Sequence, residues 1–175
     1  MQVPVWVEGW QLQCCGEPFA VGTAVSWRLT TDSEDFILRT LGAHAPAWSA
    51  ALPRLAEITG AETSGATFGA RGLNVFIDPG VDARPVGPNG VLLRLLVEDH
   101  HVGVPDAVAP TPGQVRRIDL VRFGYERDDE HQAWRPRASD AALTEVARAE
   151  KWPVDEVDGR SFAGYLVQLE VNGKS

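Results

Sequence analysis

The alternation of apolar and polar side chains over residues 24–30 constrains the fold of this chain more than any other feature. Val25, Trp27 and Leu29 share one parity, and small or polar residues separate them. A period of two residues is typical of a β-strand that buries one face and exposes the other to water. We therefore expect a strand here, paired in a hairpin with an extended run at residues 3–14.

A turn rich in glycine and proline separates these two segments. Gly16, Pro18 and Gly22 favour chain reversal, because glycine tolerates positive φ and proline fixes φ near the value that turns need. Each buried tryptophan of the hairpin would contribute about 150–250 Å² of contact area. These tryptophans are Trp6, Trp10 and Trp27. We expect the hairpin to anchor the core.

The remaining segments carry strand and helix signals in similar number. Apolar runs with a period of two, or apolar on both parities, predict strands at residues 91–98, 115–125 and 163–171. Capping residues or helical spacing predict helices at residues 35–41, 44–59 and 140–151. The first of these helices would begin at a capping box formed by Thr31 and Glu34.

The length of the chain favours a single domain that spans residues 1–175. With 175 residues and 44% hydrophobic content, the chain can bury a sizeable core. Residues 60–90 are rich in glycine, proline and alanine, and we expect them to form an excursion or an extra hairpin on the surface. These features favour an α+β, β-rich fold: a small barrel or strongly curved, mainly antiparallel sheet of roughly six or seven strands with two or three packed helices.

The formal net charge of −8 limits the classes of partner. It repels phosphate backbones and anionic lipid heads, so we expect neither nucleic acid nor a membrane surface as a partner. A protein partner or a small ligand, basic or cationic by preference, fits better, and the oligomeric state stays open. One basic strip could stack on bases or form cross-strand ion pairs. It comprises Arg116, Arg117, Arg122 and Arg127.

The two cysteines are adjacent in the sequence, at Cys14 and Cys15. A bridge between neighbours would be strained, because disulfides usually join Cα atoms roughly 5.5–6 Å apart. Reduced thiols fit a cytoplasmic protein. The first residues lack the pattern of a signal peptide, and no apolar run reaches the roughly 20 residues of a membrane helix. We therefore expect a cytoplasmic location.

The candidate site combines two adjacent pairs at predicted strand ends with two carboxylates. Its members are Cys14, Cys15, Glu98, Asp99, His100 and His101. Thiolate and imidazole are ligands that Zn²⁺ prefers. The simplest alternative is structural: one buried cysteine, one exposed cysteine and two solvated histidines.

Spacing argues against a complete zinc site. Adjacent strand residues point to opposite faces, so each pair supplies one ligand and the set needs His44 or a carboxylate to reach four. We expect no cofactor, with zinc as the alternative. A nucleophilic thiol would need an imidazole within hydrogen-bond reach, oriented by Glu98 or Asp99. No local catalytic signature surrounds the cysteines.

We interpret the chain as a non-enzymatic interaction or binding module that presents the cysteine turn and the histidine turn on one rim. The absence of a complete catalytic set in the sequence motivates this hypothesis. The alternative is a thiol- or metal-dependent hydrolase that uses Cys14 or Cys15 with His100 or His101.

Three runs resemble a family of actinobacterial proteins classed as a domain of unknown function. They are GWQLQCCGEPFAVGTAVSW, HHVGVPDAVAPTPGQVRRI and FAGYLVQLEV. The family carries a Gly-Trp-x-x-x-Cys-Cys-Gly-x-Pro-Phe signature, a His-His pair ahead of Thr-x-Gly-x-Val, and a Gly-Tyr-Leu-Val ending. The chain departs from this pattern mainly between His44 and Gly90, which looks expanded. The resemblance implies a cytoplasmic bacterial protein and supplies no activity, cofactor or catalytic residue.

Overall fold

The computed structural model describes residues 1–31, 33–59, 64–81, 84–87, 89–100 and 103–173, and over these residues the chain is mostly β-structure. The described residues form 15 strands, two α-helices and one short 3-10 helix. The strands are β1 (Gln2–Glu8), β2 (Phe19–Ala20), β3 (Ala24–Trp27), β4 (Leu29–Thr30), β5 (Ala50–Thr59), β6 (Ser64–Ala70), β7 (Leu73–Ile77), β8 (Arg84–Pro85), β9 (Gly90–Leu93), β10 (Leu96–Glu98), β11 (Thr111–Asp128), β12 (Ala133–Val146), β13 (Arg148–Ala149), β14 (Glu156–Val157) and β15 (Arg160–Val171). The helices are α1 (Gly9–Cys14), α2 (Glu34–Leu41) and the 3-10 helix η1 (Gly42–His44).

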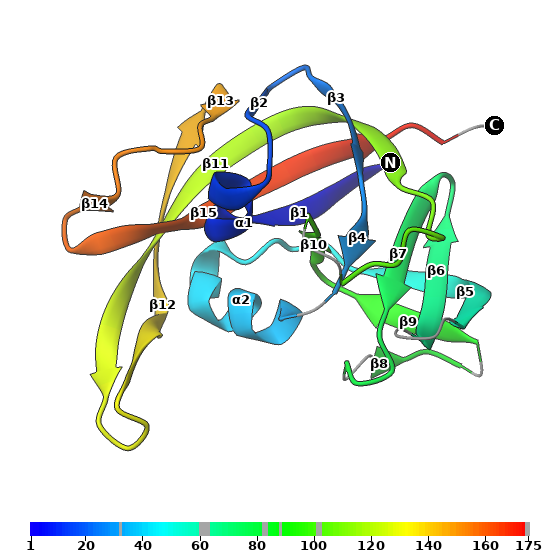
Figure 1. Ribbon diagram of the computed structural model, residues 1–175, viewed down its shortest axis with the longest axis horizontal. Helices are drawn as coiled ribbons and strands as arrows, with labels where there is room; N and C mark the ends of the chain where they lie inside the picture. The colour runs from blue at the N-terminus through cyan, green and yellow to red at the C-terminus, as the bar shows by residue number, and fades with distance from the viewer. Residues whose placement is uncertain (32, 60–63, 82–83, 88, 101–102, 174–175) are drawn as a thin grey trace.

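Thirteen of the strands in the described part of the chain form one mixed sheet. Its main path runs β12-β11-β15-β1-β10-β4-β7-β6-β5-β9-β8, and β3 and β14 attach to β11 and β15. The pairs β1–β10 and β4–β7 are parallel, and the other pairs are antiparallel. Figure 1 shows the long strands β11, β12 and β15 on one side, the shorter strands β5 to β9 on the other, and α2 between them.

The last strand lies in the middle of the sheet and pairs with the first. Val5 of β1 is opposite Val167 of β15, and the other edge of β15 pairs with β11. Tyr165, Val167 and Leu169 point to one face and are fully buried, while Leu166 packs on the opposite face. This separation follows from the period of two residues along a strand.

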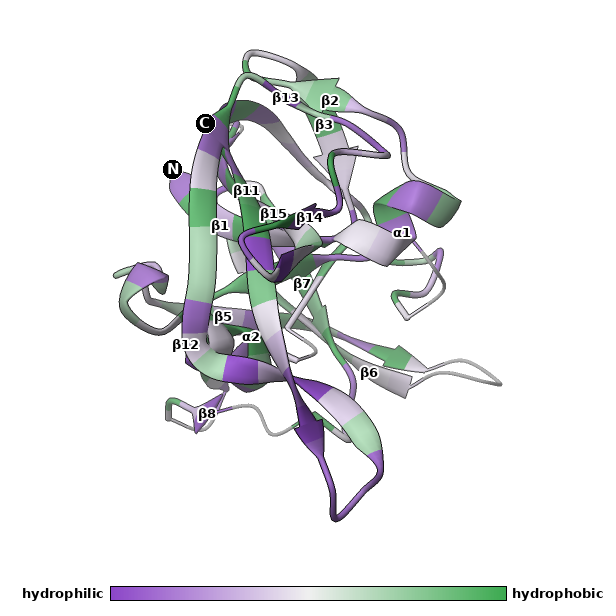
Figure 2. Cartoon of the chain, turned by 90° about the vertical axis from the view of Figure 1, so that its left-hand side faces the viewer, coloured by the Kyte–Doolittle hydropathy of each residue, from purple (hydrophilic) through white to green (hydrophobic). Residues whose placement is uncertain are grey.

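Each face of the central strands has its own core. The larger core holds Val3, Val5 and Val7 of β1 among its members. The second lies under α2, where Ile37 and Leu41 pack with residues of β1, β11 and β15. Figure 2 shows hydrophobic residues along the middle of β11 and β15, and a mainly hydrophilic tip on the β11–β12 hairpin.

The helix α2 confirms the prediction for residues 35–41, although the predicted capping box does not form. The N-cap residue, Ser33, has a φ of 65° and makes no side-chain cap. The amide of Glu34 donates to the Thr31 carbonyl oxygen (3.1 Å), and the Glu34 carboxylate instead accepts from Arg94. Gly42, with a φ of 56°, ends the helix as expected, because glycine adopts positive φ without a steric penalty.

The predicted fold class is wrong. The described residues form 15 strands where six or seven were expected. The main path of these strands is open at β12 and β8 and does not close into a barrel. The only α-helices among the described residues are α1 and α2, so the chain is predominantly β rather than α+β. Several strands are only two or three residues long. Such short strands carry too few residues for a period of two to be recognised in a sequence.

The predicted N-terminal hairpin is also wrong. The strand β1 ends at Glu8, α1 follows directly, and β1 pairs with β15 and β10 rather than with β3. Gly9 lies so close to β15 that a Cβ there would be 2.8 Å from the Ala163 carbonyl oxygen. Trp6 and Trp27 are buried in different cores, whereas Trp10 is 56% exposed.

Two predicted helices are strands in the structure. Within residues 44–59, β5 pairs with β6 and β9, and within residues 140–151, β12 pairs with β11. A register shift between Phe123 and Tyr125 interrupts the β11–β12 ladder, and Ser139 has a φ of 57° rather than a capping conformation. Long-range pairing therefore overrides the helix propensity of these alanine-rich runs.

The other predicted strands are confirmed in outline. Residues 24–30 form β3 and β4, and residues 91–98 fall in β9 and β10. The predicted strands at residues 115–125 and 163–171 lie within β11 and β15. Within residues 60–90, the described residues include β6 and β7, which form an antiparallel hairpin in the main sheet. Neither helix in the described part of the chain is long and apolar enough to cross a membrane.

Candidate functional site

A cavity of about 490 Å³ lies where β1 passes into α1, beside the end of β10 and the start of α2. Its described lining consists of Glu8, Trp10, Gln11, Thr30, Ser33, Phe76, Asp78, Gly80, Val81, Val97, Glu98, Asp99 and Gly103. Four of these residues are carboxylates, and none of the described lining residues is a lysine or an arginine. We call this space the acidic cavity.

Glu98 is the buried carboxylate of the acidic cavity. The strand β10 lies between β1 and β4, so its last residue is enclosed and the Glu98 side chain is only 2% exposed. Its Oε1 lies 3.1 Å from His100 Nε2. Its Oε2 is buried and accepts no hydrogen bond from the residues that the structure describes. On folding, Oε2 therefore loses its hydrogen bonds to water and gains none from the described residues.

Burial makes Glu98 a weak acid. Loss of hydration, and to a smaller extent the negative charge of Asp99, raise the pKa of Glu98 from 4.5 to about 8. A surrounding of low dielectric constant favours the neutral form of a carboxyl group. Glu98 therefore holds a proton at neutral pH, and this proton can be shared with His100 Nε2.

Backbone hydrogen bonds fix the segment that follows Glu98. The amide of His100 donates to Oε1 of the buried Gln11 side chain (2.9 Å), which ties α1 to the end of β10. The amide of Asp99 donates to the Arg28 carbonyl oxygen (3.0 Å), and the amide of Val104 donates to Asp99 Oδ2 (2.7 Å). The acidic cavity is thus held by three segments that are distant in the sequence.

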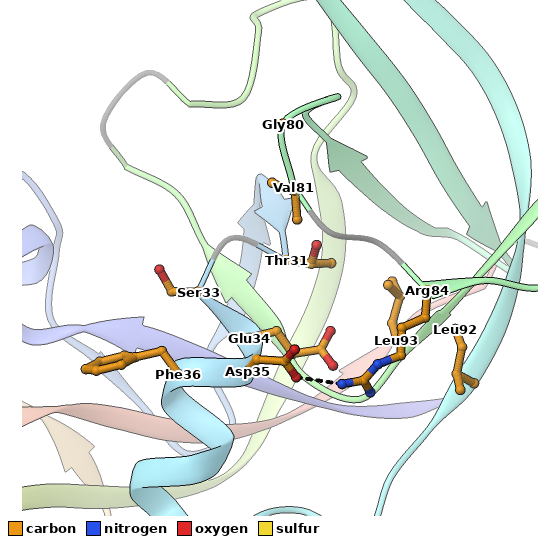
Figure 3. Close-up of a pocket in the computed structure, with 10 residues that line it drawn as sticks. All are labelled: Thr31, Ser33, Glu34, Asp35, Phe36, Gly80, Val81, Arg84, Leu92 and Leu93. Atoms are coloured by element: carbon orange, nitrogen blue, oxygen red, sulfur yellow. Dashed lines mark hydrogen bonds and ion pairs between the residues drawn. The ribbon is translucent and has the colours of Figure 1, made fainter. Parts of the chain in front are cut away.

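A neighbouring cavity of about 240 Å³ shares Ser33, Gly80 and Val81 with the acidic cavity. Figure 3 shows Arg84 reaching the Asp35 carboxylate, with Phe36 turned away from this ion pair. Arg94 also contacts Asp35 and lies 3.1 Å from Glu34. The carboxylates of this neighbouring cavity are therefore compensated by arginines, unlike Glu98 Oε2.

The cysteine turn lies near the candidate histidine. Cys14 and Cys15 are reduced and exposed at the end of α1, and the Cys15 thiol donates to Cys14 Sγ (2.7 Å). This hydrogen bond, more than any other effect, raises the pKa of Cys15. A Cβ added to Gly16 would lie 3.0 Å from His100 Nε2. The structure therefore places the turn that carries the cysteines against His100.

The other predicted residues are distributed unevenly around this site. Glu98 and Asp99 line the acidic cavity, whereas His44 ends η1 as an exposed residue outside its described lining. The prediction for His101 lies outside the described residues. Over the described ranges, no group of three or more His, Cys, Asp or Glu residues is arranged to hold a metal ion. The structure thus adds no support to the zinc hypothesis.

The arginine strip of β11 is engaged in intramolecular contacts. Arg116 pairs with Glu170, and Arg117 lies 2.9 Å from Asp119. Arg122 donates to the Val154 carbonyl oxygen (2.6 Å). Arg127 donates to Gln132 Oε1 (2.7 Å). The alternative considered for this strip, cross-strand ion pairing, is found for Arg116 and for Arg117, which also lies 3.4 Å from Glu145 of β12.

Sequence reasoning missed several members of the site. Trp10 and Gln11 were assigned to a strand, whereas the structure places them in α1. Asp78 follows an apolar strand in the same way as Asp99 does. Polar residues directly after apolar strands could have been grouped as neighbours at one edge of the sheet. The sequence does not show, however, which of these strands are adjacent in the sheet.

Comparison with known proteins gives a family and no activity. A model described as a family of unknown function (DUF6578) matches residues 1–171. No curated protein and no solved structure matches the chain.

Proposed function

The chain belongs to the DUF6578 family of unknown function, and we propose that it is a non-enzymatic binding module whose acidic cavity takes a small organic cation. A primary ammonium group is the chemistry that suits this cavity best. The observation that carries the proposal is Glu98 Oε2, which is buried at the cavity and accepts no hydrogen bond from any described residue.

An ammonium ion would supply what Glu98 lacks. It has three N–H donors, and its positive charge offsets the repulsion between Glu98 and Asp99. Hydrogen bonds to charged groups are stronger than those between neutral groups. A bound cation would also lower the pKa of Glu98, so binding would release the proton that this residue holds at neutral pH.

The remaining lining favours an organic amine over a bare metal ion. Phe76 and Val97 are buried, Trp10 is exposed, and all three contribute apolar surface to the cavity. A tryptophan ring attracts ammonium groups through its π-face. Hard divalent ions instead need several oxygen ligands in a fixed arrangement, and no such group occurs among the described residues.

A cytoplasmic location in a bacterium is part of the same proposal. It is supported by the two reduced cysteines and by the rarity of structural disulfides in that compartment.

The proposal is tested by calorimetric titration with aliphatic and aromatic primary amines at pH 8 and low salt. Butanol and butyrate serve as neutral and anionic controls. We expect amines to bind, the controls not to bind, and Glu98→Gln to weaken amine binding by about 10- to 100-fold, since hydrogen bonds to charged groups are lost. The exposed Glu156→Gln in β14 is the matched variant and should bind as the wild type does. Failure of every amine to bind, or equal binding by Glu98→Gln, would overturn the proposal.

A further inference from the structure

A third cavity, also of about 240 Å³, lies against α2 between α1 and the strands β11, β12 and β15. Six aromatic side chains line it, namely Trp6, Trp10, Phe36, Phe123, Tyr125 and Phe162. We call it the aromatic cavity. An apolar cavity of about 150 Å³ is sufficient for a benzene molecule, so the aromatic cavity has room for one aryl ring.

The floor and the mouth of the aromatic cavity differ in exposure. Trp6 and Phe123 are buried and stacked, with their ring centroids 5.8 Å apart and their planes 7° from parallel. Phe36 is 45% exposed and Trp10 is 56% exposed. Buried stacked rings give a fixed apolar surface, while the two exposed rings would lose contact with water when a ligand covers them.

The aromatic cavity adjoins the acidic cavity. Glu8 and Trp10 line both of them, because β1 ends and α1 begins at their common wall. Glu8 is the only charged residue in the described lining of the aromatic cavity. Its negative charge also helps to raise the pKa of Tyr125, after the larger effect of burial. The two cavities therefore meet at Glu8 and Trp10, with carboxylates lining the acidic cavity and aromatic rings lining the aromatic cavity.

We propose that the ligand is an arylalkylamine, with its ammonium group at Glu98 in the acidic cavity and its aromatic ring in the aromatic cavity. This inference rests on the proposed amine-binding function and names the class of amine. The Trp6 indole nitrogen indicates which ring would fit, because Nε1 is buried and donates to no acceptor among the described residues. A ring that carries a hydroxyl or carbonyl oxygen would offer it an acceptor.

The test compares phenethylamine with butylamine in the wild type by calorimetry. We expect phenethylamine to bind about 10- to 100-fold more tightly, because burial of an aromatic ring adds apolar contact that a short alkyl chain lacks. Equal affinities would overturn the inference and leave the amine-binding function standing. Absence of binding by both amines would overturn the function as well. This comparison needs no variant.

A pair of variants locates the ring. Phe36→Ala should weaken phenethylamine binding about tenfold and leave butylamine binding within twofold of the wild-type value. Trp134→Ala removes another exposed aromatic residue, 70% exposed, outside both cavities, and should change neither affinity. If Phe36→Ala weakened both amines equally, the ring would not occupy the aromatic cavity, and the assignment of the ligand to this cavity would be wrong.

Discussion

Replacement of Glu98 by glutamine tests the reasoning about this buried carboxyl group without any ligand. Glutamine has the shape of the protonated acid and can donate to His100 Nε2, but it does not titrate. In the wild type the folded-state pKa of Glu98 is about 8, above its ordinary value of 4.5. The folded state therefore holds a proton that the unfolded state has released between these two pH values. Stability contributed by this group is present below about pH 4.5 and is lost as the pH rises through about 8.

The expected magnitude follows from the difference between the two pKa values. The Glu98 side chain is 2% exposed, so solvent screens it little. Each pH unit between the two values lowers the free energy of unfolding of the wild type by about 1.4 kcal/mol, so the total lost above pH 8 is on the order of 5 kcal/mol. The free-energy difference between Glu98→Gln and the wild type should grow by this amount from pH 4.5 to pH 8.5. Above that pH it should stay constant.

Urea unfolding followed by tryptophan fluorescence at five pH values measures this difference. The exposed Glu156→Gln serves as the control, and its free energy of unfolding should run parallel to that of the wild type. If Glu98→Gln also ran parallel to the wild type from pH 4.5 to 8.5, the carboxyl group would titrate normally and the argument from burial would be refuted. If the wild type instead gained stability relative to Glu98→Gln as the pH rises, the charged form of Glu98 would be the one stabilised in the folded state.

Two further predictions concern the stability of the sheet and use the same urea assay at pH 7. Tyr165→Phe should lower the free energy of unfolding by about 1–3 kcal/mol, because the buried phenol accepts from the Glu150 amide (3.0 Å) and donates to the Glu150 carbonyl oxygen (2.9 Å). An unchanged unfolding midpoint would mean that water replaces both bonds. Gly164→Ala should lower the free energy of unfolding by about 1–3 kcal/mol through overpacking, because a Cβ there would meet the Val7 carbonyl oxygen and lie 2.8 Å from the Trp6 ring. A variant as stable as the wild type would show that β1 and β15 can move apart without loss of stability.

The parts of the fold that could be predicted are those in which the sequence pattern is long and local. Residues 163–171 alternate over nine positions, and the structure buries Tyr165, Val167, Leu169 and Val171 on one face. Helix α2 has an amphipathic pattern and a glycine stop, both of which are read from adjacent residues. In these segments, burial and local propensity agree.

The errors arose where distant partners decide the structure. The alanine-rich residues of β12 favour a helix in isolation, but ten residue pairs with β11 hold them in a strand. The break between β1 and α1 depends on Gly9 meeting Ala163, which is 154 positions away in the chain. The prediction of an extended run at residues 3–14 was therefore wrong beyond Glu8, where α1 begins.

The candidate site was predicted in part for a similar reason. Glu98 and Asp99 stood out because they follow an apolar strand and precede two histidines. Glu98 is buried because β1 and β4 flank β10, and no local sequence pattern predicts that these strands are neighbours. The contact between Gln11 and His100 likewise joins segments that the sequence leaves unconnected.

The pairing of β1 with β15 has a consequence for synthesis of the protein on the ribosome. The strand β1 is translated well before β15, its antiparallel partner opposite Val3, Val5 and Val7, which is not available until residue 171 has left the exit tunnel. Domains with such non-local contacts fold slowly, and exposed strands in a nascent chain are prone to aggregation. The valine-rich β1 would therefore be a binding segment for chaperones during translation, and a nascent chain arrested before β15 emerges should remain sensitive to proteases along its whole length.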